Sequence, residues 1–238
     1  MGARRLLTLL DETGSTNDDA LALGRSGAAH GTAVTARRQT AGRGRRGHVW
    51  ASPAGNLYLS VVLRPRVTPS RLPGIAAACG LGVADVLKKV QLKWPNDLLV
   101  QDRKLAGILV EASRDGAGEP FAVCGVGVNV GSAPRDLRAT CLAELGAAPS
   151  FSPLAEALRA GIVARVDAWA AAPGGRPLDG IRDDYLSRLA WLGEKVRVLA
   201  ATDGAELGRG TFETVDPWGR AVVDGVPYAA ERASLRPT

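Results

Sequence analysis

The stretch GRGRRGHVW, at residues 42–50, decides how the chain is interpreted, because it concentrates glycine and arginine at a density that excludes regular secondary structure. Residues 37–50 hold three glycines and five arginines without an apolar period, which predicts a loop. Residues 42–47 also match the GxGxxG dinucleotide-binding pattern. That fold requires a helix directly afterwards and an acidic residue about 20 positions later. Residues 48–55 are not helical in pattern and the next acid is Asp85, so we reject that fold.

A loop of this composition suits an anionic ligand, because glycine lets the backbone fold around an anion and arginine supplies paired, permanently charged donors. From Ala20 to Ala84 the sequence has nine arginines and no Asp or Glu, which indicates an anion held in one place. A solvated basic loop or an RNA-binding tail would have the same composition. The RNA alternative is disfavoured because the loop lies between predicted strands, with only Trp50 and Tyr58 nearby for base stacking.

The composition is that of a folded protein, with 238 residues, 46% hydrophobic and 23% charged, and predicts one large domain or one with a small appendage. Three scattered cysteines and two histidines do not form a disulfide framework or a zinc or histidine metal centre. The apolar run Leu6–Leu10 is too short for a signal-peptide core or a membrane span. We therefore expect a cytoplasmic protein that does not associate with membranes.

Apolar patterns between residues 13 and 192 predict alternating helices and strands, with Thr16 and Ser152 as helix N-caps. The predicted helices cover residues 13–23, 73–90, 152–170 and 181–192, and the strands cover 33–35, 56–63, 92–111 (two strands about a turn) and 123–130.

The pattern changes after Gly193, where short segments alternate with period two and are separated by Asp-Gly and Pro-Trp-Gly turns. Such a texture is typical of a small β-barrel. We expect a larger domain at residues 1–190 and a small barrel domain at 191–238.

Three further motifs carry candidate chemistry. In KWPND (93–97) the oxygens of Asn96 and Asp97 suit a hydrated magnesium ion or ribose hydroxyls, although an ordinary Asx turn has the same pattern. Lys104 opens an apolar strand, where it could neutralise charge on a phosphate or simply be a turn lysine. Gly107 within that strand indicates close approach of a ligand. Asn129, after a buried run, needs polar partners from a ligand or a neighbouring loop.

The order of these motifs along the chain resembles that of the biotin protein ligase family, most densely between residues 13 and 130. The resemblance implies an α+β fold: a catalytic domain similar to class II aminoacyl-tRNA synthetases, with a mixed, mostly antiparallel sheet, followed by an SH3-like barrel. It implies the monofunctional type without an N-terminal DNA-binding domain, so we expect no sequence-specific DNA binding. The matching motifs are GSTN (14–17), Gln39, GRGRRGHVW (42–50), NLYLS (56–60), KWPND (93–97), RKLAGILVE (103–111) and GVGVN (125–129).

The activity implied by the resemblance has two steps. Biotin and ATP, with Mg²⁺, form biotinyl-5′-AMP and pyrophosphate, and biotin then passes to one lysine of the biotin carboxyl carrier domain of an acyl-CoA carboxylase. A related lipoate–protein ligase is the nearest alternative, and GRGRRG together with KWPND favours biotin. We expect a monomer or a weak homodimer.

The resemblance also implies site residues, without assigning metal ligands. His48 departs from the family, which usually has Arg or Lys there, and this weakens an expected contact with the ATP tail. The loop at 42–48 is predicted to be mobile without ligand. The implied residues are Ser15, Thr16, Asn17, Gln39, Arg43, Gly44, Arg45, Lys104 and Gly107 for biotin, with Lys104, Arg43 and Arg45 catalytic, and Arg45, His48, Trp50, Lys93, Asn96, Asp97, Asn129 and Arg236 for ATP.

Overall fold

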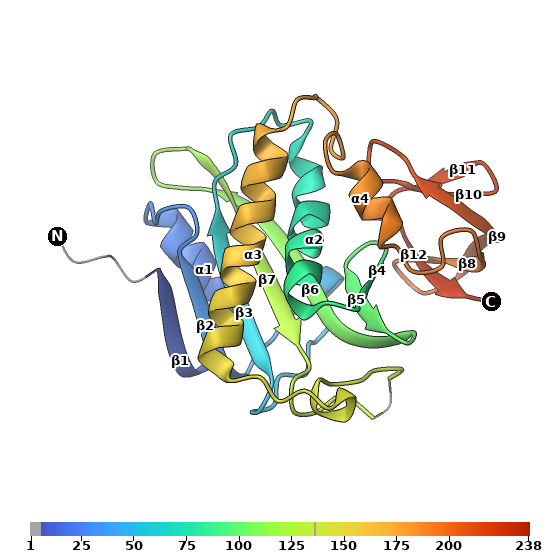
Figure 1. The fold of residues 1–238 in the computed structure, drawn as a ribbon. Coiled ribbons are helices and arrows are strands. Elements are labelled where there is room, and N and C mark those ends of the chain that lie inside the picture. Colours follow the sequence, from blue (N-terminus) through green and yellow to red (C-terminus); the bar gives the residue numbers. More distant parts are fainter. Residues whose placement is uncertain (1–5, 136) are drawn as a thin grey trace.

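The computed structural model describes residues 6–135 and 137–238, which form two sheets with helices packed on the larger one (Figure 1). The larger sheet has seven strands in the order β1-β2-β3-β7-β6-β5-β4. Its strands are β1 (Leu7–Thr13), β2 (Ala33–Gln39), β3 (Leu57–Leu63), β4 (Gln91–Lys93), β5 (Asp97–Val100), β6 (Arg103–Arg114) and β7 (Pro120–Val128).

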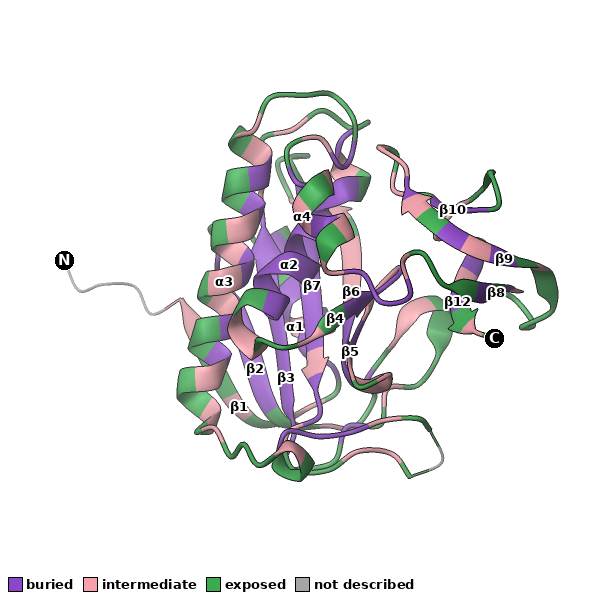
Figure 2. Ribbon diagram, turned by 45° about the vertical axis from the view of Figure 1, so that its right-hand side comes forward, coloured by how far each residue is buried: buried purple, intermediate pink, exposed green. Residues whose placement is uncertain are grey.

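The larger sheet is mixed and mostly antiparallel. Strands β1 and β2 pair in parallel, and the other neighbouring strands pair antiparallel. The central strands β3 and β7 are almost wholly buried (Figure 2), which explains their continuous apolar sequences. This architecture confirms the α+β prediction.

Helices cover both faces of this sheet. On one face lie α2 (Ile75–Leu87) and α3 (Phe151–Ala171), side by side in Figure 1, over the main apolar core. On the opposite face α1 (Thr16–Arg25) buries Ala20 and Leu21 against Phe121 and its neighbours on β3 and β7. Because alternate strand residues point to opposite faces, β3, β6 and β7 serve both layers.

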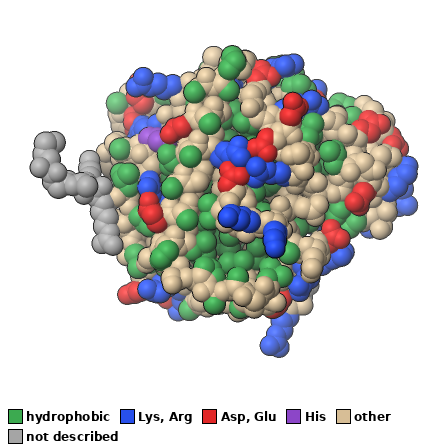
Figure 3. Space-filling view, viewed as in Figure 1, with side chains coloured by type: hydrophobic (Ala, Val, Ile, Leu, Met, Phe, Trp, Pro, Cys, Tyr) green, Lys and Arg blue, Asp and Glu red, His purple; other side chains and the backbone are tan. Residues whose placement is uncertain are grey.

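The exposed side of α2 and α3 carries basic and acidic side chains next to one another (Figure 3). Arg165 of α3 and Asp85 of α2 form an ion pair between the two helices. No helix of the described segments has the length and apolar character needed to cross a membrane.

The smaller sheet has five antiparallel strands in the order β11-β10-β9-β8-β12, as expected for an SH3-like unit, although within the described residues its pairing is not closed into a barrel. Its buried side chains, such as Phe212, belong to the same apolar cluster as the larger sheet, so the domain boundary near residue 190 stays a prediction. Helix α4 (Arg182–Ser187) precedes this sheet, whose strands are β8 (Lys195–Ala200), β9 (Glu206–Val215), β10 (Ala221–Val223), β11 (Val226–Tyr228) and β12 (Ala233–Pro237).

Several local boundaries differ from the sequence-based expectations. The N-cap of α1 is Ser15 rather than Thr16, and that of α3 is Ser150 rather than Ser152. Residues 37–39, expected in a loop, belong to β2, because they continue its backbone pairing with β1 up to Gln39. Lys88, expected in the last turn of a helix, follows the end of α2 with a φ of +52°. Backbone pairing and tertiary packing outweigh local side-chain patterns at these ends.

Helices α2 and α3 cross where each has a glycine. A Cβ atom on Gly82 would lie 2.6 Å from the carbonyl oxygen of Gly161, so the two backbones touch. We predict that Gly82→Ala lowers the free energy of unfolding by about 2 kcal/mol, because the helices must separate. Urea denaturation measures the change.

Gly80→Ala, on the same helix, is the matched control. Its Cβ would meet the side-chain end of Leu92 at 3.2 Å, which can shift, and alanine favours the helix by about 1 kcal/mol. Equal losses in the two variants would contradict the close crossing.

Candidate active site

A row of residues in register crosses the larger sheet on its α1 face. Tyr58, Gly127, Gly107, Asp97 and Lys93 are successive partners across β3, β7, β6, β5 and β4. Directly opposed residues share one face of a sheet, so two glycines stand between an aromatic residue and a charged pair. This row forms the floor of the candidate site.

The glycines let the arginine-rich loop lie directly on the sheet. A Cβ on Gly127 would come within 2.5 Å of the Trp50 indole nitrogen, and one on Gly107 within 2.8 Å of Trp50 Cζ3. The ring of Trp50 therefore covers both glycines. Its indole Nε1 is buried and has no hydrogen-bond partner in the described part of the chain.

Polar side chains fix the first turn of α1 to the sheet. Gln39 Oε1 accepts from the backbone N of Thr16 at 2.9 Å and from its hydroxyl at 3.0 Å. Gln39 Nε2 donates to Ser52 Oγ at 3.0 Å, and Ser52 in turn donates to the carbonyl of Trp50. The helix start, the end of β2 and the loop are therefore connected by hydrogen bonds. Ser15, the N-cap, is buried beside them.

Asn17 joins this network to β6. Its Nδ2 donates to Glu111 Oε2 at 2.7 Å, and its Oδ1 accepts from Ser60 Oγ at 2.6 Å. Glu111 was missed in the sequence interpretation. It stands four residues after Gly107 on the same strand, and the period-two pattern of β6 places both on one face.

Arg43 is held by carboxylates. Its guanidinium donates to both oxygens of Asp18, at 2.6 and 2.8 Å, and to Glu111 Oε2 at 3.1 Å. The hydrogen bond with Asp18 and the adjacent charge of Glu111 raise the pKa of Arg43.

Arg45 and Arg46 extend to the smaller sheet instead. Arg45 donates to Asn96 Oδ1 at 3.1 Å and to the carbonyl of Ala230 at 2.7 Å, and Arg46 donates to the same carbonyl at 2.6 Å. Burial, followed by the charge of Arg46, lowers the pKa of Arg45. A short 3₁₀ turn (Arg45–Gly47) aims the two side chains, and His48 ends it, exposed, with its carbonyl accepting from Gly44 N at 2.7 Å. The structure does not test the predicted mobility of residues 42–48.

A charged cluster occupies the other end of the row. Asp97 lies between two ammonium groups, 2.9 Å from Lys93 Nζ and 2.6 Å from Lys104 Nζ. The side chains of Lys93 and Asp97 are only 9% and 12% exposed. Lys104 Nζ also lies 4.9 Å from the ring centroid of Trp50, in a cation–π contact that joins the cluster to the loop.

The ion pairs shift the pKa values of both buried partners, Asp97 and Lys93. Burial alone would raise the pKa of Asp97, but Lys104 and Lys93 lower it to about 2. Burial lowers the pKa of Lys93, and Asp97 opposes that effect. The exposed Arg236 of β12 is close enough for its charge to lower the pKa of Lys93 further, so this predicted residue does lie near the cluster.

Asn129 is satisfied by the protein itself. Its Nδ2 donates to the carbonyls of Thr140, at 3.1 Å, and Lys104, at 3.3 Å. Of the two explanations for this residue, the neighbouring-loop contact is therefore observed. Asn129 holds the backbone of Lys104 in place.

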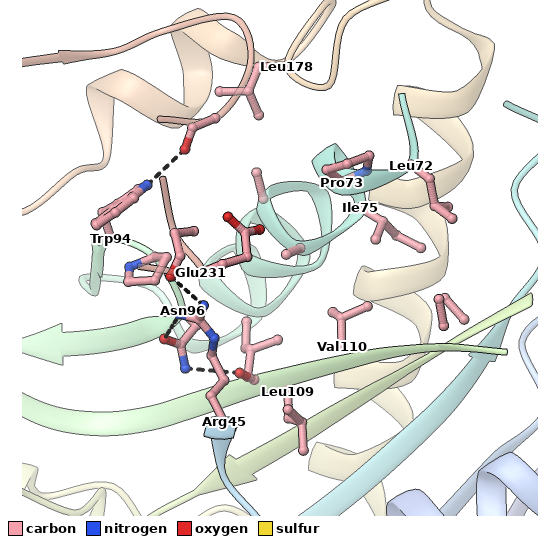
Figure 4. Close-up of a pocket in the computed structure, with 18 of the residues that line it drawn as sticks. Arg45, Leu72, Pro73, Ile75, Trp94, Asn96, Leu109, Val110, Leu178 and Glu231 are labelled. Carbon is pink, nitrogen blue, oxygen red and sulfur yellow. Dashed lines mark hydrogen bonds between the residues drawn. The ribbon is translucent and has the colours of Figure 1, made fainter. Parts of the chain in front are cut away.

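A cavity of about 530 Å³ opens next to Arg45 and Asn96 (Figure 4). Arg45, Asn96 and Glu231 line it together with apolar side chains of α2 and β6, such as Ile75 and Val110. Lys93, Asp97 and Lys104 are not among its lining residues, so of the residues predicted for ATP only Arg45 and Asn96 line it.

The charge pattern predicted that the nine arginines of residues 20–84 surround one anion site. The structure shows that they are spread over several parts of the fold. Arg64 pairs with Asp115 at 2.8 Å. Arg71 is buried and donates to the carbonyls of Trp169 and Ala172 at the end of α3. Arg64 and Arg71 therefore stabilise the fold. Of the nine arginines, Arg43, Arg45 and Arg46 are the ones that lie in the candidate site.

The donor set does not suggest a resident metal ion. Both oxygens of Asp97 are engaged by lysines, and Asn96 Oδ1 accepts from Arg45. Within residues 6–135 and 137–238 no group of three or more His, Cys, Asp or Glu side chains forms a metal-binding cluster. Magnesium would therefore arrive as part of the nucleotide substrate.

Comparison with known proteins places this fold among the protein ligases. Residues 10–129 match the model of the biotin/lipoate A/B protein ligase family, and the chain belongs to that family. It is 38% identical over 234 residues to the biotin–[acetyl-CoA-carboxylase] ligase of Mycobacterium tuberculosis, covering 92% of this chain and 84% of that protein. The Paracoccus denitrificans ligase of the same name is also 38% identical, with 91% and 93% covered.

A solved structure agrees with this assignment. The biotin protein ligase from Aquifex aeolicus in complex with biotin and ATP is 28% identical, superimposes with a TM-score of 0.81, and is matched over 98% of this chain and 99% of its own. The family and fold expected from the motifs are confirmed. The individual site residues stay predictions.

Replacing Asp97 tests the charged cluster. Asp97→Asn leaves two ammonium groups without a counter-charge, so we predict a loss of about 3 kcal/mol in the free energy of unfolding near neutral pH. The folded pKa of about 2 lies below the reference value of 3.8, so Asp97 stabilises the fold fully above pH 4 and loses this effect as the pH falls toward 2.

Urea denaturation of both proteins between pH 2 and 7 checks this. The difference between them should shrink below pH 4. Asp11→Asn, at a side chain that is 97% exposed, is the control. A difference that is constant across this range would contradict the prediction.

Proposed function

We propose that the chain forms biotinyl-5′-AMP from biotin and MgATP and transfers biotin to a lysine of a biotin carboxyl carrier domain. The observation that carries the proposal is the Lys93–Asp97–Lys104 cluster in register with two glycines and beneath an arginine-rich loop. The names of the relatives and the biotin and ATP of the Aquifex structure support the substrates.

In the first step a carboxylate oxygen of biotin attacks the α-phosphorus of ATP. An O–P bond forms, the bond to the bridging oxygen breaks, and pyrophosphate leaves. Several negative charges meet at this point. Lys104 and Arg45, with Lys93 behind them, would offset that charge, which is a catalytic effect that needs no enzyme nucleophile.

Asp97 serves this step indirectly. It keeps two ammonium groups close together before any phosphate arrives, and it fixes the position of Lys104. A cation that is already in place does not have to be reorganised during the reaction.

The glycines provide the floor for the biotin rings. In this assignment biotin lies against Gly107, with its ureido end toward Ser15, Thr16, Asn17 and Gln39 and its carboxylate toward Lys104. Because Trp50 covers Gly107 and Gly127, its ring must lift as biotin enters. Trp50 would then form part of the wall beside the nucleotide.

In the second step the acceptor lysine amine attacks the carbonyl carbon of the mixed anhydride. An amide C–N bond forms, the C–O bond to AMP breaks, AMP leaves with the electron pair of that bond, and the nitrogen loses a proton to solvent. Closure of the loop over the anhydride would keep water away from it until the carrier domain arrives.

Pyrophosphate release from MgATP tests the proposal. We predict release that depends on biotin and falls about 100-fold or more in Lys104→Ala, the loss typical of removing one stabilising charge. Lys195→Ala removes an exposed lysine on β8 and is the control. Release that is unaffected by biotin would reject the biotin assignment. Release with lipoate or octanoate in its place would show a lipoate-type ligase.

A further inference from the structure

We propose that Glu111 is a positioning residue that sets the Asn17 amide at the biotin-ring end of the site and clamps the Arg43 end of the arginine-rich loop. The proposal rests on the function proposed above. It assigns one carboxylate to two tasks that otherwise have separate residues: orienting a ligand-binding amide and keeping the loop closed.

The first task follows from hydrogen-bond chemistry. An ionised carboxylate only accepts, so Asn17 must turn its NH₂ group toward Glu111, where Nδ2 and Oε2 are 2.7 Å apart. The carbonyl of the Asn17 side chain then faces Ser60, whose hydroxyl donates to it at 2.6 Å. The same carbonyl oxygen lies directly over Gly125. One amide hydrogen is used on Glu111, and the second is left for the ureido oxygen of biotin.

The second task follows from charge. Arg43 lies between Glu111 on β6 and Asp18 on α1, and its guanidinium donates to both. This triad ties the start of the loop to two elements on either side of the site. The partners are 33–55% exposed, so the clamp is of the modest, reversible strength that a loop which opens and closes requires.

The location separates Glu111 from the reacting atoms. Four residues along β6 from Gly107 amount to about 13 Å, at the end of the site away from Lys104. Glu111 therefore acts through Asn17 and Arg43, and we do not assign it to phosphoryl transfer.

Two substitutions divide the tasks. Asn17 and Arg43 both donate to Oε2, so in Glu111→Gln an amide oxygen at that position can still accept from Asn17. The negative charge that holds Arg43 is lost, and the NH₂ group takes the place of Oε1, 3.4 Å from the guanidinium, donor against donor. Glu111→Ala removes both contacts. Glu119→Gln, at an exposed site next to β7, removes one negative charge elsewhere and is the matched control.

Trypsin measures the clamp, because the loop carries cleavable bonds after Arg45 and Arg46. We expect cleavage to be about fivefold faster in Glu111→Gln and Glu111→Ala, as for loss of a partly exposed ion pair. In an Arg43→Ala background Glu111→Gln should add no further acceleration, since the partner is already gone. High salt should speed cleavage of the wild type more than that of Glu111→Gln.

Biotin kinetics measure the orientation of Asn17. We expect the KM for biotin to rise about tenfold in Glu111→Ala, with kcat within about twofold of the wild type, because a binding contact is lost from ground state and transition state alike. Glu111→Gln should raise KM less.

Wild-type cleavage rates and KM in Glu111→Ala would overturn the proposal, and so would a lowered melting temperature as the only change. If wild-type protein shows no biotin-dependent turnover, the proposed function fails. Trypsin cleavage then still decides whether Glu111 clamps the loop.

Discussion

Strand register is the constraint on which the site depends. Five neighbouring strands place Tyr58, two glycines, Asp97 and Lys93 in one line across a single face. A shift of one residue in any of these pairings would turn the glycine floor or the charged pair to the α2–α3 face. That face is filled by the apolar core, and the cost of burying a charge there fixes the register strongly.

The same constraint explains why the charged cluster can be so deeply placed. Lys93 faces Asp97 directly across a hairpin. A local irregularity in the β5–β6 pairing, between Leu98 and Leu99, brings Lys104 opposite Leu99, and from there its ammonium group reaches the same carboxylate. Two ammonium groups held this close together would repel one another without the anion between them. The backbone therefore supplies a compact positive centre that is assembled before any ligand arrives.

Much of this could be predicted from sequence, and the failures have physical causes. The order of motifs identified the family, and the period-two texture after Gly193 identified a second unit. The run of nine arginines without an acidic residue wrongly predicted a single anion site, because arginine also caps helices and bridges loops, as Arg71 and Arg64 do here. The pairing of Arg43 with Asp18 and Glu111 could not be predicted, since it joins residues 25 and 68 positions apart that meet only in the fold.

The hydrogen-bond partners of the loop arginines divide the loop into two parts. Arg43 bonds to carboxylates, and charge-assisted bonds of that kind are roughly twice as strong as those to neutral acceptors. Arg45 and Arg46 share one neutral carbonyl, that of Ala230. A phosphate is charged, as a carboxylate is, so it would be a better acceptor than this neutral carbonyl. The loop therefore has a carboxylate-paired end at Arg43 and, at Arg45 and Arg46, an end whose donors rest on neutral acceptors and would gain most from an anion. In that arrangement Ala230, between β11 and β12, is the neutral acceptor from which an anionic ligand would draw the two guanidinium groups.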